Sequence, residues 1–261
     1  MTEDPYVLRD DAAGVATLTL NRAQSRNSLG LPMLTALKEA LDGVAADPAA
    51  RVVVIGGAGP AFCAGHDLRE MSAELFDAVY AHKLFTLCGD VMQAIVRMRK
   101  PVIARVHGVA TAAGCQLVAS CDLAVAAEGS RFATPGVNIG LFCTTPMVAL
   151  TRAIAPKHAL QLLLTGDLID APTALRIGLI NEIVPETELD ARIDALARKL
   201  AGKSPVTLAM GKAAFQAQRD LPLAEAYAYA AGVMTENLQT MDAQEGICAF
   251  LQKRTPEWTG R

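Results

Sequence analysis

The segment that decides the fold is Ala61-Phe-Cys-Ala-Gly-His-Asp-Leu-Arg-Glu-Met71, which follows the apolar run Val52-Val-Val-Ile55 and a glycine-rich turn. The apolar run is typical of a buried strand. The small residues before His66 allow the backbone to pass close to a ligand. If a helix begins near Asp67, the N–H of His66 is free at its start. The segment therefore predicts a strand-to-helix turn that presents a backbone donor.

A second turn of the same kind follows further along the chain. The strand-like Pro101-Val-Ile-Ala-Arg-Val106 precedes His107-Gly-Val-Ala-Thr-Ala-Ala-Gly-Cys-Gln116, and a short helix is expected over residues 113–120. Two backbone N–H groups, each at a strand-to-helix turn, are what is needed to hold one oxyanion. The two turns together therefore indicate a site that binds a polarised carbonyl.

Length and composition exclude several classes of protein. With 261 residues, 52% of them hydrophobic, the chain can bury a large core as one domain or as a domain with an appendage. It has 24 Lys and Arg against 27 Asp and Glu, a net charge of −3, and no run of four basic residues, so we expect no nucleic-acid partner. A few placed cations and helix N-termini would have to hold an anionic ligand.

Cysteine, histidine and apolar patterns bear on metals and localisation. The six cysteines lack C-x-x-C spacing, which predicts reduced, mostly buried thiols. The four histidines lack the H-E-x-x-H pattern, so no metal site is expected. Residues 1–5 do not resemble a signal peptide. The apolar segment 109–127 is interrupted by Gln116 and Asp122, so we expect no membrane span. Together these features predict a cytoplasmic protein.

Hydrophobic periodicity predicts an α/β core followed by helices. Strands are expected at 15–20, 51–55, 101–106 and 122–126, with helices at 31–44, 74–98 and 113–120. Alternating elements and long apolar strands favour a layered or spiral α/β core. Three or four further helical segments are expected, at 186–201, 205–218, 222–237 and 242–253, the last opened by the capping-box-like Asp242-x-x-Glu245. An alanine-rich face in the third of these helices would pack against another subunit or within the chain: Ala224, Tyr227, Ala228 and Ala231.

The motifs resemble, in order and at matching separations, those of the crotonase (enoyl-CoA hydratase/isomerase) superfamily. The resemblance covers nearly the whole chain, and its segments are residues 21–29, 62–71, 100–122, 132–140 and 250–254. The run Thr134-Pro-Gly-Val-Asn-Ile-Gly-Leu-Phe-Cys143, with Gln116 upstream, is most similar to the enoyl-CoA hydratase domain-containing protein 3 subgroup. The resemblance implies a ββα spiral core over residues 1–200 that carries the acyl-CoA site. It also implies a C-terminal helical trimerisation region over 201–261, in a homotrimer or a dimer of trimers.

The resemblance also implies roles for individual residues. The backbone N–H groups of His66 and Ala113 would form the oxyanion hole, and CoA would enter as part of the substrate, with no separate cofactor. The residues implied to contact CoA are Arg26, Ala64, His66, Asp67, Leu68 and Lys253, the last reaching a neighbouring subunit's CoA. Arg and Lys suit phosphate by charge; as an alternative, Arg26 and Lys253 are solvated surface cations.

The chain departs from the family pattern where proton transfer takes place. Gln116 and Gly136 stand at the positions of the two glutamates that flank water in the family's hydratases, so efficient hydration of an enoyl thioester is not expected. Ala112 and Ala113 stand where glycine is usual, and we expect the oxyanion hole to survive provided the local φ is negative.

Which group replaces the glutamates stays open. The His66 ring titrates in a useful range, and Glu70 or Glu74 is a second candidate, set against a solvated helix face. Asp67 and Asp122 are expected to cap helices or turns, His107 to be a packed core histidine, and Cys115 to lack a paired base. Leu141, Phe142, Met71 and Leu75 are expected to line the acyl site.

Two functions therefore compete. The first is a crotonase-type enzyme of fatty acid or acyl-CoA metabolism that stabilises a thioester enolate, and the second is a catalytically silent acyl-CoA-binding or regulatory protein. A third interpretation, a dinucleotide fingerprint at Gly57-Ala-Gly59, is disfavoured because Pro60 disturbs the helix start and Phe62 stands where a small residue is required.

Overall fold

Strands that are apolar on both faces build the centre of the fold. The computed structural model describes residues 4–261. In β3 (Val52–Gly57) the first five residues are buried, and in β6 (Leu123–Ala127) the last four are. Strands buried on both faces are typical of a parallel sheet covered by helices, and the predicted α/β class is confirmed.

Two sheets share the strands. The larger has the order β1-β2-β3-β4-β6-β9, in which only β1 runs antiparallel to its neighbour. The smaller has the order β5-β7-β8, with β5 and β7 parallel. The remaining strands are β1 (Val7–Ala12), β2 (Val15–Leu20), β4 (Val102–Val106), β5 (Val109–Thr111), β7 (Arg131–Ala133), β8 (Ile169–Asp170) and β9 (Glu182–Val184).

The chain spirals by repeating one unit. A strand of the larger sheet is followed by a strand of the smaller sheet and then by a helix, as in β4-β5-α4 and β6-β7-α5. The helices of the core are α1 (Leu31–Ala46), α2 (Leu68–Ala73), α3 (Ala78–Arg97), α4 (Ala113–Ser120), α5 (Thr144–Ala153), α6 (Pro156–Thr165), α7 (Ala171–Arg176) and α8 (Leu189–Ala201). Three short 3₁₀ turns accompany them: η1 (Ala23–Ser25), η2 (Pro135–Ile139) and η3 (Glu186–Glu188).

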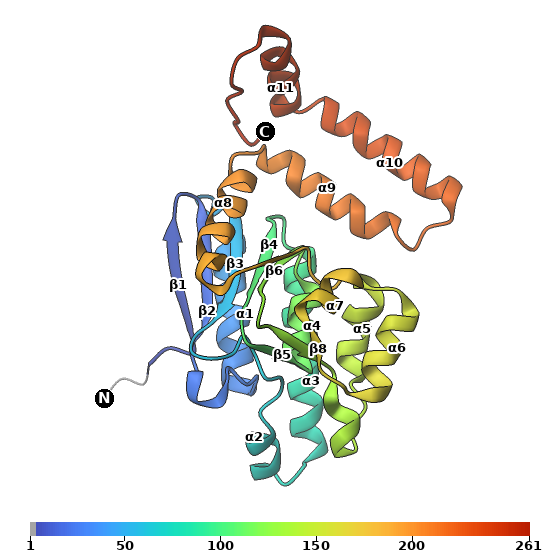
Figure 1. Cartoon of the computed structure of the whole chain (residues 1–261). Helices are drawn as coiled ribbons and strands as arrows, with labels where there is room; N and C mark the ends of the chain where they lie inside the picture. The colour runs from blue at the N-terminus through green and yellow to red at the C-terminus, as the bar shows by residue number, and fades with distance from the viewer. Residues whose placement is uncertain (1–3) are drawn as a thin grey trace.

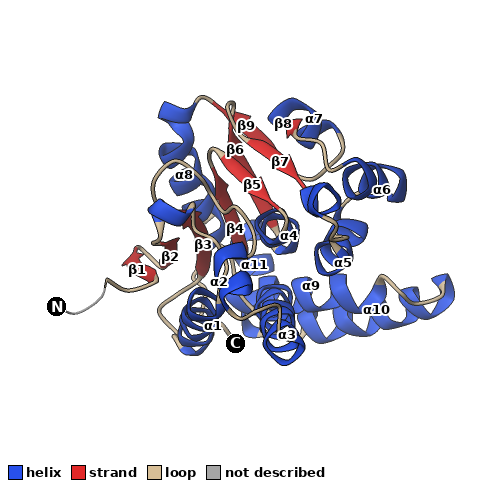
Figure 2. Ribbon diagram, turned by 90° about the horizontal axis from the view of Figure 1, so that it is seen from below, coloured by secondary structure: helices blue, strands red, loops and turns tan. Residues whose placement is uncertain are grey.

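The larger sheet is covered on both faces (Figure 2). The main core contains buried residues of α1, α3 and α4, while α8 packs on the other face through Leu189, Ile193 and Ala197. The helix predicted over 113–120 is confirmed with the same bounds.

The helix predicted over 74–98 is wrong at its start. The stretch begins at Glu74, the C-cap of α2, and α3 starts only at Ala78; between the two helices Leu75 and Phe76 take left-handed φ values of 51° and 56°. Asp77 then begins α3, because its carboxylate accepts the N–H of Tyr80 at 2.8 Å. Apolar spacing continues across this break, so periodicity alone does not reveal it.

The C-terminal helices stand apart from the sheets at the upper end of Figure 1. They are α9 (Pro205–Gln218), α10 (Leu223–Leu238) and α11 (Met241–Gln252), close to the predicted bounds. The four residues of the alanine-rich face on α10 are all exposed, so this chain does not cover that face.

The expected capping box at Asp242 is wrong. Thr240 is the N-cap of α11, and its hydroxyl accepts the N–H of Ala243 at 3.1 Å. Asp242 is 1% exposed and binds the chain end instead, with Oδ1 accepting the N–H of Thr259 at 2.7 Å and Oδ2 accepting the hydroxyl of Ser204 at 2.7 Å. We call residues 254–261 the C-terminal strap.

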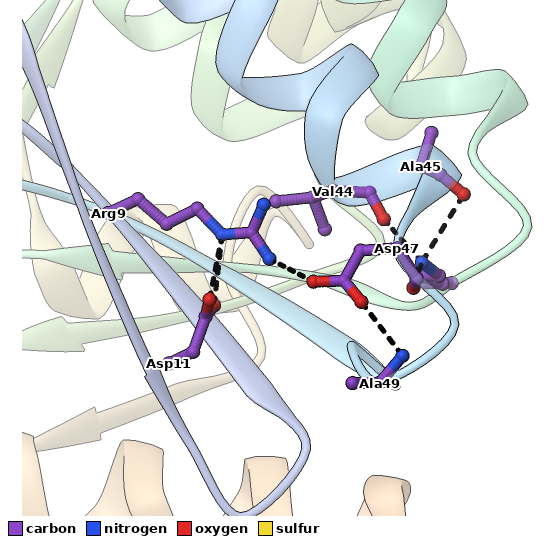
Figure 3. Close-up of polar contacts among 7 residues, drawn as sticks. Arg9, Asp11, Val44, Ala45, Asp47 and Ala49 are labelled. Carbon is purple, nitrogen blue, oxygen red and sulfur yellow. Dashed lines mark hydrogen bonds and ion pairs between the residues drawn. The ribbon is translucent and has the colours of Figure 1, made fainter.

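Polar contacts at the end of α1 join the first strand to the core (Figure 3). Arg9 pairs with Asp11 at 3.0 Å and with Asp47, whose carboxylate also accepts the N–H of Ala49 at 2.9 Å. The Lys100 ammonium donates to carbonyls of the last helical turn and to the Asp47 carbonyl at 2.6 Å. Donors at a helix C-terminus satisfy carbonyls that have no partner within the helix.

Further sequence predictions concern thiols and membranes. All six cysteines are free, and Cys63, Cys88, Cys115 and Cys143 are buried, as predicted. Across residues 4–261, the helices are too short or too polar to traverse a bilayer. Residues 1–3, part of the segment that does not resemble a signal peptide, lie outside the described residues.

Candidate active site

The two turns singled out in the sequence lie side by side. The segment after β3 runs along β5: the N–H of Phe62 donates to the His107 carbonyl at 2.9 Å and the N–H of Cys63 to that of Val109 at 3.1 Å. The N–H of Thr111 returns a bond to the Cys63 carbonyl at 3.0 Å. Segments far apart in sequence are therefore held together by their main chains.

Gly65 is one point where the turns approach closely. A Cβ there would lie 2.8 Å from the Ala112 Cβ, 2.9 Å from the Thr111 carbonyl oxygen and 3.3 Å from the Ala113 nitrogen. Its φ of 93° also disfavours any residue with a side chain. The residue after Gly65 is His66, so the two predicted donors belong to neighbouring stretches of backbone.

His66 and Ala113 each offer an unused amide. Within residues 4–261, neither N–H donates a hydrogen bond to another part of the chain. Ala113 is the first residue of α4, where helix geometry leaves the N–H without an internal acceptor and the helix dipole favours negative charge. Two such donors beside one cavity can stabilise a carbonyl oxygen that gains charge.

Ala112 departs from the expected conformation. Its φ is 50° and its ψ is −117°, so the expectation of a negative φ is wrong at this residue. The Ala112 N–H donates to the Ala133 carbonyl at 2.9 Å, and its carbonyl accepts the N–H of Gln116 at 3.0 Å. A non-glycine residue held in such a region costs on the order of 1–3 kcal/mol. The turn therefore tolerates strain to aim the start of α4 at the cavity.

A cavity of about 410 Å³ opens beside these donors. Its wall is mostly apolar and includes an imidazole, a thiol, an amide and two hydroxyls. The lining residues are Ala64, His66, Leu68, Met71, Phe85, Ala112, Ala113, Pro135, Gly136, Asn138, Ile139, Leu141, Phe142, Cys143, Thr144, Thr145 and Pro146. Met71, Leu141 and Phe142 line it as predicted, whereas Leu75 is 87% exposed on the α2–α3 turn and lies outside it.

The structure brings only one of the two glutamate positions to the cavity. Gly136 lines the wall, but a Cβ there would lie 2.4 Å from the Leu141 carbonyl oxygen and 2.8 Å from the Cys143 sulfur. Gln116 is 3% exposed inside α4, where its Oε1 faces the Cys88 thiol at 3.8 Å, and it is not part of the lining. Neither position offers a proton-transfer group to a ligand.

We expect Gly136→Ala to lower the free energy of unfolding by about 1–3 kcal/mol, because the added methyl overpacks against backbone. Urea unfolding followed by circular dichroism measures the change. Gly129→Ala is the matched control, since a Cβ there meets nothing within 4 Å. Equal losses in the two variants would contradict the close packing inferred at residue 136.

The residues expected to bind CoA are partly gathered at the cavity. Ala64 and Leu68 line it, and the Ala64 N–H donates to the carbonyl of the exposed Arg26 at 3.0 Å. The Ala64 carbonyl accepts the Thr111 hydroxyl at 3.0 Å. Lys253 is exposed at the end of α11. In space, α11 and α2 lie at opposite ends of the molecule (Figure 1), so this chain does not bring Lys253 to its own cavity.

Acidic residues near the cavity mostly satisfy backbone donors. Asp67 is the N-cap of α2, which confirms the expectation that it caps a helix or turn. It also accepts the Ser28 hydroxyl at 2.7 Å. Burial raises the pKa of Asp67, but its hydrogen bonds outweigh this and hold the pKa below its ordinary value. Asp122 accepts the Val102 N–H at 2.7 Å and so caps a strand start rather than a helix.

Glu70 and Glu74 are not in the cavity wall. Glu70 accepts the N–H of Leu31 at 3.0 Å, at the start of α1, and the hydroxyl of Tyr80 at 2.5 Å. Glu74 is exposed at the end of α2. Glu70 therefore serves as a helix cap, and this role could not be predicted because its two partners lie in other elements.

Several other candidates have structural roles. His107 is a packed core histidine, as predicted, with Nε2 at 2.7 Å from the Gly59 carbonyl oxygen. Cys115 is buried outside the lining, and burial raises the pKa of its thiol to about 12. After Gly59 the chain continues through a loop to α2 at Leu68, so the helix that a dinucleotide site needs does not begin at that turn.

Phe85 and Asn138 line the cavity but were not predicted. Phe85 is part of the regular apolar face of α3, which does not distinguish a cavity wall from a core position. Asn138 lies in the 3₁₀ turn η2, where no periodic signal exists. Their roles become visible only in the assembled fold.

Comparison with known proteins supports the resemblance described from the sequence. The family described as "Enoyl-CoA hydratase/isomerase" matches residues 10–261. A Xenopus laevis protein named "Enoyl-CoA hydratase domain-containing protein 3, mitochondrial" is 45% identical over 255 residues, which is 98% of this chain and 86% of that protein. The crystal structure of a Mycobacterium smegmatis enoyl-CoA hydratase is 51% identical, with a TM-score of 0.94 over 98% of this chain and 99% of its own.

The crystal structure of the human enoyl-CoA hydratase domain-containing protein 3 also matches, at 45% identity and a TM-score of 0.94, over 97% of this chain and 100% of its own. The Xenopus relative is named as mitochondrial, and so are its rat and human counterparts. These names contradict the prediction of a cytoplasmic protein, which is wrong. Buried reduced thiols and a small net charge occur in any reducing compartment, so they could not distinguish one from another.

The expected crotonase-like core is therefore confirmed by both the sequence match and the structural matches. The two strand-to-helix turns are present, and Gln116 and Gly136 stand at the two positions where the resemblance implies glutamates. The chain belongs to the enoyl-CoA hydratase/isomerase family of the crotonase superfamily, where it is similar to the enoyl-CoA hydratase domain-containing protein 3 group.

Proposed function

We propose that the chain binds acyl-CoA thioesters in the 410 Å³ cavity and stabilises the thioester enolate through the N–H groups of His66 and Ala113. The observation that carries this proposal is the meeting of two unused amides at Gly65, beside a largely apolar wall. Such donors are most effective where charge develops on the carbonyl oxygen in a dry site. The apolar wall suits the acyl chain.

The reaction we propose is not hydration by a glutamate pair. Gln116 does not line the cavity, and Gly136 has no room for a side chain. Each missing acid–base group is worth roughly 10²–10⁴ in rate. We therefore expect an enzyme of acyl-CoA or fatty acid metabolism, lyase- or isomerase-like by family, that forms an enolate without that pair.

A catalytically silent acyl-CoA-binding or regulatory protein is the second candidate. One observation favours it: His66 and Cys143 are the only titratable side chains among the lining residues. Burial raises the pKa of the Cys143 thiol, so this thiol stays protonated near neutral pH. The two candidates share the ligand and differ in turnover.

We further propose that CoA enters only as part of the substrate and that the chain works as a homotrimer or a dimer of trimers. Residues 201–261 would supply the contacts between subunits, after the core over 1–200. The exposed apolar side chains of α10 and α11 support this, among them Met234 and Phe250. Arg26 would approach the CoA phosphates, and Lys253 would reach the CoA of a neighbouring copy.

Hexanoyl-CoA at a concentration of about 100 times its Kd is expected to stabilise the protein by about 2.7 kcal/mol, because it binds only the folded state. Differential scanning fluorimetry and titration calorimetry measure this, with NAD as the control that leaves Tm unchanged. Crotonyl-CoA hydration should be far slower than that of a true hydratase. Unchanged Tm with CoA and with hexanoyl-CoA would refute the proposed ligand class.

A further inference from the structure

The His66 side chain has a buried ring nitrogen without a partner. His66 lines the cavity, yet its Nε2 is buried and has no hydrogen-bond partner among the described residues. A buried polar atom without a partner costs about 1–3 kcal/mol. The Phe85 ring stands edge-on to the imidazole, with centroids 5.2 Å apart, and also lines the cavity. The two residues therefore contribute to the same part of the cavity wall.

The other ring nitrogen determines the tautomer. Nδ1 lies 3.1 Å from the carbonyl oxygen of Leu29, and a carbonyl only accepts, so Nδ1 is the nitrogen that bears hydrogen. Nε2 of the neutral ring then has a free lone pair. Leu29 is itself fixed, because its N–H donates to the Gly65 carbonyl at 2.7 Å. Leu29 thus holds the backbone before His66 through its N–H and orients the His66 ring through its carbonyl.

The surroundings keep the ring neutral. Burial lowers the pKa of His66 below its ordinary value, and the bond to Leu29 and the charge of Glu70 oppose this without reversing it. Glu70 of α2 is bonded to Leu31 and to Tyr80 of α3, Asp67 caps α2, and Cys143 faces the cavity as a thiol. Near pH 7 the imidazole is therefore ready to accept a proton.

We propose that Nε2 of His66 is the catalytic base that takes a proton from the carbon next to the thioester carbonyl. This proposal rests on the proposed function and names the group that replaces the missing glutamates. The proton moves from carbon to Nε2, the C–H electron pair forms the C=C bond of the enolate, and the carbonyl oxygen takes the negative charge. Return of the proton to the same carbon, or to the γ-carbon of a 3-enoyl chain, regenerates the neutral ring.

One residue thus serves both parts of the reaction. The reacting carbon is two bonds from the oxygen that the His66 amide would hold, so a single residue can contact oxygen and proton. Positioning by a shared backbone is an effective way to align a base with its substrate. A positioned base contributes about 10²–10⁴ in rate.

The test uses the full-length protein with hexanoyl-CoA and with 3-hexenoyl-CoA. Exchange of the α-hydrogens of hexanoyl-CoA in D2O, followed by NMR, reports proton removal from the α-carbon. Conversion of 3-hexenoyl-CoA to 2-hexenoyl-CoA reports proton transfer even when the abstracted proton does not exchange with solvent. His66→Gln and His66→Phe keep the backbone donor and remove the base, so both rates should fall by about 10²–10⁴. The Kd from calorimetry should stay unchanged. The exposed His158→Gln is the matched control.

The pH profile separates a base from a packing residue. The wild-type rate should rise with pH through a pKa below the ordinary histidine value and then stay level, because the base works only when unprotonated. Retained rates in His66→Phe, or no proton transfer from either thioester despite binding, would overturn the proposed base. Absence of binding would instead overturn the proposed function.

Discussion

The double variant Ala112→Gly/Ala113→Pro is expected to lower any enolate-forming rate by about 10²–10³-fold, because proline removes one of the two proposed oxyanion donors. Binding of hexanoyl-CoA should weaken about tenfold, as expected for the loss of one hydrogen bond. Proton exchange and calorimetry measure the two effects. Both losses would arise without altering any side chain that could transfer a proton.

The position of Ala113 makes this variant structurally feasible. Ala113 is the first residue of α4, where proline is favoured and the missing N–H breaks no helical bond. Proline restricts the residue before it, and Ala112 already has a φ of 50°, so glycine at 112 is needed to absorb the strain.

Ala112→Gly alone is the control. It keeps both donors and should unfold at nearly the wild-type urea concentration, since relief of strain is offset by about 0.5–1 kcal/mol of added freedom in the unfolded chain. If the double variant folds and retains both rate and affinity, the Ala113 amide is not an oxyanion donor.

Asp242→Ala is expected to release the C-terminal strap, at a cost of about 3 kcal/mol, because the buried Ser204 hydroxyl and the donors of the strap lose a charged acceptor. Asp242 accepts the hydroxyl of Ser204, the N–H and hydroxyl of Thr259 and the N–H of Gly260. Trp258, the only tryptophan, donates its indole N–H to the Gly202 carbonyl at 2.9 Å. Its fluorescence therefore reports whether the strap is bound.

Acid should release the strap in the wild-type protein too. Burial raises the pKa of Asp242, but the bonds from Ser204, Thr259 and Gly260 outweigh it, so the folded pKa lies below the ordinary value. The Arg254 guanidinium likewise lowers the pKa of Glu245 to about 2. Because both folded pKa values are depressed, the stabilisation is complete above about pH 4 and is lost as pH falls through them.

Trp258 emission should accordingly move to longer wavelength only below about pH 4 in the wild type, and at neutral pH in Asp242→Ala. The exposed Asp220→Ala, in the α9–α10 turn, is the control and should behave as the wild type. An Asp242→Ala spectrum identical to the wild type, with the same urea midpoint, would show that the strap is held by other contacts.

Local patterns predicted the parts of this fold that depend on near neighbours in sequence. The helix over 113–120 and the strand over 15–20 have the predicted bounds, because helical and alternating spacing reflect which face is buried. The break at Leu75 and Phe76 could not be predicted, since apolar residues rarely take left-handed φ and nothing in their spacing indicates it.

The candidate site was predictable in its main chain and less so in its side chains. The motifs located His66 and Ala113, whereas the contacts that assign Asp242 to the strap and Glu70 to α1 join residues distant in sequence. The burial of Gln116 away from the cavity likewise depends on how α4 is rotated in the fold. Such assignments follow from tertiary packing and have no local signature.

Donors that belong to the main chain have a consequence for the evolution of this scaffold. Almost any substitution leaves a peptide N–H in place, so the grip on a carbonyl persists while the surrounding side chains diverge. The η2–α5 segment also lines the cavity, and outside the tightly packed Gly136 its lining residues, Asn138 and Cys143 among them, can be replaced by new reactive groups. Exchanging that segment between relatives is therefore a rational route to new thioester chemistries on an unchanged framework.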